Sequence, residues 1–307
     1  MLSTILVPLD GSALAEQALP VAERVAQATR ARVVLTRVVP ALSGAETSIE
    51  AGVAHAAREY LEEIAAGLRR AGITVGVTVP EGDAAAQTVR AVAALSVDLI
   101  VMSTHGRSGI GRWRYGSVAD AVMRLASVPV LLVPPDKGVP WPTDRRLRII
   151  VPLDESPLSE AVLGPAVELA TTLDAEVVLA EVVAWPPLMY GDPIELLPYD
   201  PEEQLAEARG YLAAVAARLR ESGARVRWRA EVGPTPAATI VQVARDERAD
   251  LIAMATHGRS GLARVVLGST TTGTLQHAGV PLLIVRPTEL LTAKPPGHES
   301  NAALVKA

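Results

Sequence analysis

The sequence contains no cysteine and has only three lysines. Without cysteine there can be no disulfide, thiolate nucleophile, iron–sulfur cluster or cysteine-ligated zinc. The lysines, at positions 137, 294 and 306, lie in proline- or glycine-rich stretches or near the last residue. Their placement excludes a P-loop lysine, a protein-kinase lysine and a Schiff-base lysine in a folded pocket. The formal net charge of −5 gives no electrostatic basis for binding nucleic acid.

The sequence also has little that would direct it to a membrane. Its first residues lack the basic region and small-residue cleavage site of a signal peptide. No apolar run approaches the ~20 residues that span a bilayer. We therefore expect a cytoplasmic protein without a membrane partner. Its 49% apolar and 21% charged residues are typical of globular proteins, and 307 residues suggest two domains.

Three motifs occur twice, at offsets of 144, 152 and 152 residues. They are ILVPLD and IIVPLD (5–10 and 149–154), THGRSG (104–109 and 256–261), and VPVLLV and VPLLIV (128–133 and 280–285). A repeat of this length indicates two similar domains rather than a solenoid. We assign the domains to residues 1–135 and 147–287, a proline-rich linker to 136–146 and a loose tail to 288–307.

Within each copy, short apolar runs alternate with helical periodicity. In the first copy we expect strands at 2–9, 32–39, 73–79, 98–102 and 129–133, and helices at 13–29, 49–71, 83–95 and 117–126. Ser12 and Ser156 suit the N-caps of the first helices. This alternation predicts a tandem repeat of doubly wound α/β domains, each with a five-stranded parallel sheet. Pairing of the edge strands 129–133 and 281–285 would cover two apolar edges and form an internal pseudo-dimer.

A glycine-containing loop follows the fourth strand of each copy and leads into a helix. Nine residues separate Gly106 from Gly116-Ser117, and the same spacing separates Gly258 from Gly268-Ser269. Ligands of doubly wound sheets bind beyond the carboxyl ends of the strands. Glycines at a helix N-terminus suit a phosphate, because backbone N–H groups can approach it closely. Positive charge on the two loops comes from Arg107, Arg112, Arg259 and Arg264.

Taken together, these motifs resemble the universal stress protein family of tandem, two-domain type. The resemblance covers both copies and implies the strand order 3-2-1-4-5, bound ATP with or without Mg²⁺, and a regulatory role in stress response. It places Asp10 and Asp154 at the ribose and adenine. The full set of candidate nucleotide-binding residues is Pro8, Asp10, Val38, Val39, Gly106, Arg107, Gly109, Gly116, Ser117, Pro152, Asp154, Val182, Val183, Gly258, Arg259, Gly261, Gly268 and Ser269.

The sequence departs from the family pattern at one position in each copy. ATP-binding members usually carry a glycine three residues before Gly106 and Gly258, where this sequence has Ser103 and Ala255. A scaffold that has lost its ligand therefore stays open, as does an enzyme with slow ATP hydrolysis or other nucleotide chemistry. We assign no catalytic residue, because no general base or nucleophile stands out beside the loops. We assign no metal ligand either, and a further homodimer stays open.

Two further alternatives concern the loop after the first strand. Asp10 and Asp154 could cap the following helix instead of contacting a ligand. The next residue is Gly11 in the first copy and Glu155 in the second. The phosphate loop also has an arginine at position 114 where the second copy has valine at 266. These differences predict that the first site binds ATP about tenfold more tightly, which corresponds to ~1.4 kcal/mol.

Overall fold

The computed structural model describes residues 2–41, 47–104, 116–135, 141–185, 200–256 and 267–287. The first domain contains β1 (Thr4–Pro8), α1 (Ala13–Glu16), α2 (Leu19–Thr29), β2 (Arg32–Thr36), α3 (Thr47–Arg70), β3 (Val75–Thr78), α4 (Ala84–Ala94), β4 (Leu99–Ser103), α5 (Ser117–Leu125) and β5 (Val130–Val133). The second contains β6 (Arg148–Leu153), α6 (Pro157–Glu160), α7 (Leu163–Thr172), β7 (Glu176–Ala184), α8 (Pro201–Glu221), β8 (Val226–Gly233), α9 (Pro236–Asp246), β9 (Leu251–Ala255), α10 (Ser269–His277) and β10 (Leu282–Val285).

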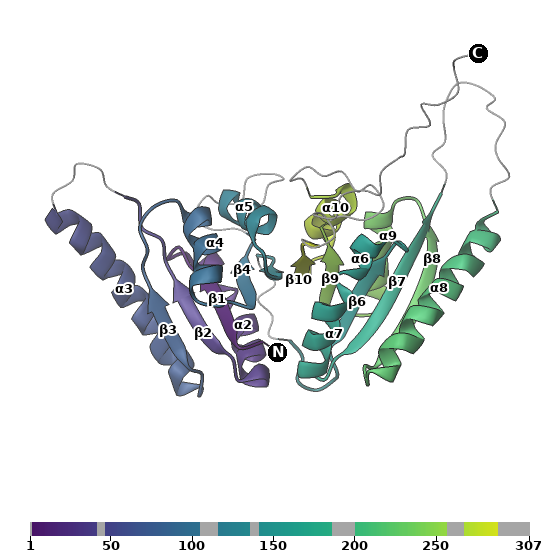
Figure 1. Cartoon of the computed structure of the whole chain (residues 1–307), viewed down its shortest axis with the longest axis horizontal. Coiled ribbons are helices and arrows are strands. Elements are labelled where there is room, and N and C mark those ends of the chain that lie inside the picture. Colours follow the sequence, from purple (N-terminus) through teal and green to yellow (C-terminus); the bar gives the residue numbers. More distant parts are fainter. Residues whose placement is uncertain are drawn as a thin grey trace, which may run out of the picture.

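These strands form one continuous ten-stranded sheet in the order β3-β2-β1-β4-β5-β10-β9-β6-β7-β8. Each half has the predicted order 3-2-1-4-5 and parallel pairing throughout. At the centre β5 and β10 pair antiparallel, with Leu131 opposite Leu283 (Figure 1). The predicted pairing of the two edge strands is therefore confirmed, and it merges the two five-stranded sheets into one.

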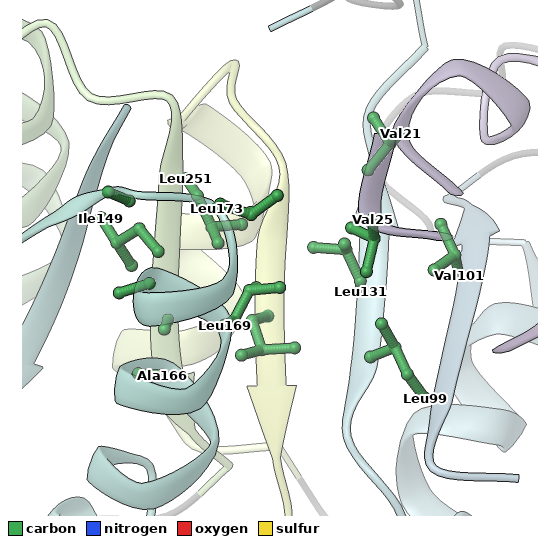
Figure 2. Packing of buried hydrophobic residues seen from close by; sticks show 14 of the residues in the cluster. Val21, Val25, Leu99, Val101, Leu131, Ile149, Ala166, Leu169, Leu173 and Leu251 are labelled. Carbon is green, nitrogen blue, oxygen red and sulfur yellow. The ribbon is translucent and has the colours of Figure 1, made fainter. Parts of the chain in front are cut away.

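Alternating side chains along the strands build two hydrophobic cores, one on each face of the sheet. One face is covered by α1, α2, α3, α7 and α8, and the other by α4, α5, α9 and α10. Each core runs across the seam between the domains, where α2 and α7 also contact each other. Figure 2 shows Val25 of α2 beside Leu131 on one side of the seam, and Leu169 of α7 on the other.

The sequence prediction of one helix over residues 13–29 is wrong. The structure has α1, then a break at Gln17-Ala18, then α2. Pro20 lies in the first turn of α2, and proline cannot donate the hydrogen bond that would continue a helix through this position. Pro165 stands in the first turn of α7, and the second domain shows the same break between α6 and α7. The two breaks let a short capped helix close the loop after the first strand of each domain.

Part of the predicted linker packs against the second domain. Trp141 is only 7% exposed, and its Nε1 donates a hydrogen bond of 3.1 Å to the carbonyl oxygen of Asp250. The guanidinium of Arg145 donates two hydrogen bonds, of 2.8 and 2.7 Å, to the Asp250 carboxylate. The approach to β6 is therefore fixed by an aromatic anchor and a bidentate ion pair.

Asp98 is the equivalent of Asp250 in the first domain and gives a test by pH. Its carboxylate accepts hydrogen bonds from the Ser3 backbone and hydroxyl and from the Thr4 N–H, at 2.6 to 2.9 Å. Desolvation by burial raises the pKa of Asp98, but these hydrogen bonds outweigh it and lower the pKa overall. A carboxyl group whose pKa is lower in the folded state than in the unfolded state stabilises the fold at pH values above its unfolded pKa. This stabilisation is lost as the pH falls through the folded-state pKa.

We expect Asp98→Asn to reduce the free energy of unfolding by about 1 kcal/mol at neutral pH, a value discounted for partial exposure. The difference from the unsubstituted protein should begin to shrink as the pH falls below the unfolded pKa of about 3.9. It should vanish only below the lowered folded-state pKa, where Asp98 is protonated in both states. Urea denaturation at a series of pH values measures this. A difference that stays constant with pH would show that the charge of Asp98 is irrelevant to stability.

Candidate functional site

Two clefts open at the carboxyl ends of the strands, one in each domain. The first, of about 260 Å³, lies at the ends of β1, β2 and β4 beside α4 and α5. The second, of about 320 Å³, lies at the ends of β6, β7 and β9 beside α9 and α10. In the first domain the chain crosses to the other side of β1 between β3 and β4, and in the second it crosses to the other side of β6 between β8 and β9. The clefts therefore lie at the switch points of the half-sheets.

The two clefts are built from equivalent residues. Every residue that lines the first has its repeat partner lining the second, at an offset of 144 up to Val38 and of 152 from Ala84 onward. The pairs with identical side chains are Pro8 and Pro152, Leu9 and Leu153, Asp10 and Asp154, Val38 and Val182, Met102 and Met254, Thr104 and Thr256, Gly116 and Gly268, and Ser117 and Ser269. The internal repeat therefore extends to the surface of the clefts.

Most described candidate residues line these clefts. They are Pro8, Asp10, Val38, Gly116 and Ser117 in the first, and Pro152, Asp154, Val182, Gly268 and Ser269 in the second. Val39 and Val183 are not among the lining residues. The backbone of Val39 is bonded to the β3–α4 connection, since its N–H donates to Pro80 and its carbonyl accepts from Gly82. Val183 is buried in a small cluster beneath α8. The candidates Gly106, Arg107, Gly109, Gly258, Arg259 and Gly261 lie outside the described residues.

Each cleft is bordered by the N-terminus of a helix whose N-cap residue is a glycine. Gly116 is the N-cap of α5 and Gly268 that of α10, and within the described residues neither cap makes a side-chain hydrogen bond. The Gly116 N–H donates to Thr104, and the Gly268 N–H to Thr256, so both helices are tied to a strand end. The first-turn N–H groups and the positive end of the helix dipole are the features by which such a helix end can attract an anion.

The backbone angles of these caps do not require glycine, but the space around Gly268 favours it. The φ angles are −53° for Gly116 and −57° for Gly268, which any residue adopts. A Cβ placed on Gly268, however, would lie 3.1 Å from the carbonyl oxygen of Thr256. A side chain there would crowd the strand end and occupy the wall of the cleft.

Asp10 and Asp154 line the clefts and also organise the following helix. Asp10 Oδ1 accepts hydrogen bonds from the Ser12 N–H (2.9 Å) and hydroxyl (2.6 Å), and Ser12 caps α1 by accepting from Ala15. Asp154 Oδ1 holds Ser156 in the same way, with a hydroxyl contact of 2.6 Å. The N-caps are thus the predicted serines, and the alternative that the aspartates cap the helices directly is wrong. Each carboxylate instead fixes its capping serine.

The clefts differ in where they place hydroxyl groups. Thr36, Thr88 and Ser103 of the first are replaced by Ala180, Ile240 and Ala255 in the second. Conversely, Ala15, Val118 and Ala119 of the first are replaced by Ser159, Thr270 and Thr271. Apart from the threonine and serine that both clefts share, the additional hydroxyls of the first cleft lie at strand ends and on α4, whereas those of the second lie on α6 and in the first turn of α10. The sequence reading missed Thr36 and Thr88, although the repeat offset alone would have paired them with Ala180 and Ile240.

Within the residues that the structure describes, no group of three or more histidine, aspartate or glutamate side chains could hold a metal ion.

Among the helices that the structure describes, none is long and apolar enough to cross a bilayer.

The fold and the clefts define a class of protein: two doubly wound α/β domains in tandem, joined edge to edge, with an equivalent cleft in each. Comparison with known proteins gives the family. The universal stress protein family matches residues 1–134 and 146–286. The chain belongs to this family, as the resemblance in its sequence indicated.

Individual relatives agree with this assignment, two of them over most of the chain and one over a single-domain length. A universal stress protein of Mycolicibacterium smegmatis is 28% identical over 298 residues, which cover 92% of this chain and 97% of the relative. The universal stress protein MJ0531 of Methanocaldococcus jannaschii is 34% identical over 143 residues, covering 45% of this chain and 81% of its own. The crystal structure of a universal stress protein from Archaeoglobus fulgidus superposes on this chain with a TM-score of 0.68 at 21% sequence identity. The superposition covers 92% of this chain and 98% of the Archaeoglobus chain, and it shows that the two share a fold.

Proposed function

We propose that each domain binds one adenine nucleotide in its cleft, ATP in the first instance, and that the protein acts as a regulatory module whose occupancy is read by partners. The observation that supports the proposal is the equivalence of the two clefts. Each is lined by a helix N-terminus whose N-cap residue is a glycine. Such a terminus, at the switch point of a doubly wound sheet, is suited to a phosphate group.

The described residues fit the other parts of a nucleotide as well. Pro8, Val38 and Met102 give the first cleft apolar walls for a base, and Pro152, Val182 and Met254 do the same in the second. Asp10 and Asp154 line the same clefts, and a carboxylate there could accept hydrogen bonds from ribose hydroxyls. Mg²⁺ would enter with the triphosphate as its counter-ion.

Mass spectrometry of small molecules released by heat from freshly purified protein tests the proposal. We expect adenine nucleotide to be released. A released ligand without an adenine base, or protein that carries none and takes up none when mixed with ATP, would contradict it. Incubation of the loaded protein with Mg²⁺ then separates a binding protein, which keeps its ATP, from a slow hydrolase, which converts it.

A further inference from the structure

Beside the two equivalent clefts, one pair of equivalent positions carries opposite charge. Arg37 directly precedes Val38, which lines the first cleft, and Glu181 directly precedes Val182, which lines the second. Arg37 follows the last residue of β2, and Glu181 lies within β7 opposite Leu153. The same backbone position beside the cleft thus has a guanidinium in one domain and a carboxylate in the other.

Arg37 is held against the loop that carries Asp10. Its guanidinium lies 4.9 Å from the centre of the Tyr60 ring, in a cation–π contact. It also covers Gly11, because a Cβ on that glycine would lie 3.1 Å from the guanidinium carbon. Gly11 has a φ of +86° and no side chain, so the loop leaves room for the arginine.

In the second domain the residues equivalent to Gly11 and Arg37 are both acidic. Glu155 replaces Gly11 and has a φ of +63°, and Glu181 replaces Arg37. Glu181 is only 7% exposed, and its Oε2 atom is fully buried. From the first domain to the second, these two positions change from a glycine and a basic side chain to two acidic side chains.

A tyrosine present in both domains is influenced by these side chains and by the cleft aspartates. Tyr60 donates to Glu16 at 2.8 Å, and its counterpart Tyr211 donates to Glu160 at 3.0 Å. Burial and the hydrogen bond to Glu16 raise the pKa of Tyr60, Arg37 opposes this rise, and Asp10 adds to it.

For Tyr211 every contribution has the same sign. Burial, the bond to Glu160, and then the charges of Glu181 and Asp154 all raise its pKa. Glu181 and Asp154 therefore act on one hydroxyl in the second domain, as Arg37 and Asp10 do in the first. The tyrosine, its glutamate partner and the cleft aspartate are thus common to both domains. The domains differ in the next side chain, which is the basic Arg37 in the first and the acidic Glu181 in the second.

We propose that this charge reversal makes the two clefts select adenine compounds of different charge. The cleft of the first domain gains affinity as the number of phosphates increases, and the cleft of the second favours adenosine and the monophosphate over ATP. This inference rests on the proposed function for the adenine base and extends it to the ligand class of each cleft. We expect the ratio of the ATP and adenosine dissociation constants to differ between the clefts by about tenfold at low ionic strength.

The test uses the full chain with one cleft blocked at a time. Gly268→Val leaves the first cleft and Gly116→Val leaves the second; each is titrated calorimetrically with adenosine, AMP and ATP at low and high salt. In the Gly116→Val background, Glu181→Gln should restore part of the preference for ATP. In the Gly268→Val background, Arg37→Gln should remove part of it. Glu221→Gln and Arg70→Gln, at the far ends of α8 and α3, are matched charge controls and should leave the ratios unchanged (Figure 1).

The outcomes separate this inference from the proposed function. Equal dependence on ligand charge in the two clefts, or ratios that Glu181→Gln and Arg37→Gln shift no more than the controls do, would overturn the inference and leave nucleotide binding intact. Failure of adenosine, AMP and ATP alike to bind the unsubstituted chain would overturn the proposed function, and this inference with it.

Discussion

Gly116→Val should remove nucleotide binding from the first domain and leave the second site intact, and Gly268→Val should do the reverse. Each glycine caps a helix whose first turn lines the cleft, so a β-branched side chain would exclude a phosphate from the N-terminus. In the second domain the Cβ also meets the Thr256 carbonyl at 3.1 Å. We expect the affinity of the substituted site to fall by about a hundredfold or more, which corresponds to ~2.7 kcal/mol.

A control separates loss of the site from loss of the fold. Gly210 on α8 has no atom within 4 Å of the position a Cβ would take, so Gly210→Val should retain both sites. Circular dichroism of all three variants should match the unsubstituted protein, and calorimetry then gives the number of sites. Unchanged stoichiometry in either cap variant, with the fold intact, would count against a ligand at the helix N-terminus.

The second large effect concerns the seam between the domains. Leu131 is fully buried in β5, opposite Leu283 of β10, and belongs to the core that continues across the seam. Leu131→Ala removes side-chain volume where strands of both domains prevent collapse, so we expect a loss of about 3 kcal/mol in the free energy of unfolding. Denaturation in urea measures this loss.

The matched control for this variant is Leu125, which ends α5 and is 50% exposed. Leu125→Ala should change the free energy of unfolding by less than about 0.5 kcal/mol. Similar losses for Leu125→Ala and Leu131→Ala would contradict the description of the seam as part of a shared core.

Much of this architecture follows from the repeat in the sequence. Short apolar runs alternating with amphipathic segments are local signals, and they placed the strands and most helices close to their observed positions. The edge pairing of β5 and β10 was also predictable, because an apolar edge strand in each of two similar domains needs cover. The break before Pro20 was missed because helical periodicity continues through it, and only the missing proline N–H interrupts the hydrogen bonds.

The charge reversal beside the clefts could not be found in the same way. Gly11 and Glu155 stand out as a pair because they lie within a repeated motif. Arg37 is positioned by its contacts with Tyr60 on α3 and with the loop at Gly11, and these contacts join segments far apart in the sequence. A periodic pattern carries no information on such contacts, so the importance of this position emerged only from the fold.

We propose that one chain carries two nucleotide sites. The number of ATP molecules bound per chain tests this most directly. Isothermal titration calorimetry of nucleotide-free protein with ATP, with and without Mg²⁺, should give two molecules bound per chain, one for each cleft. Absence of any binding heat at millimolar ATP, ADP and AMP, or a single site that survives both Gly116→Val and Gly268→Val, would contradict it.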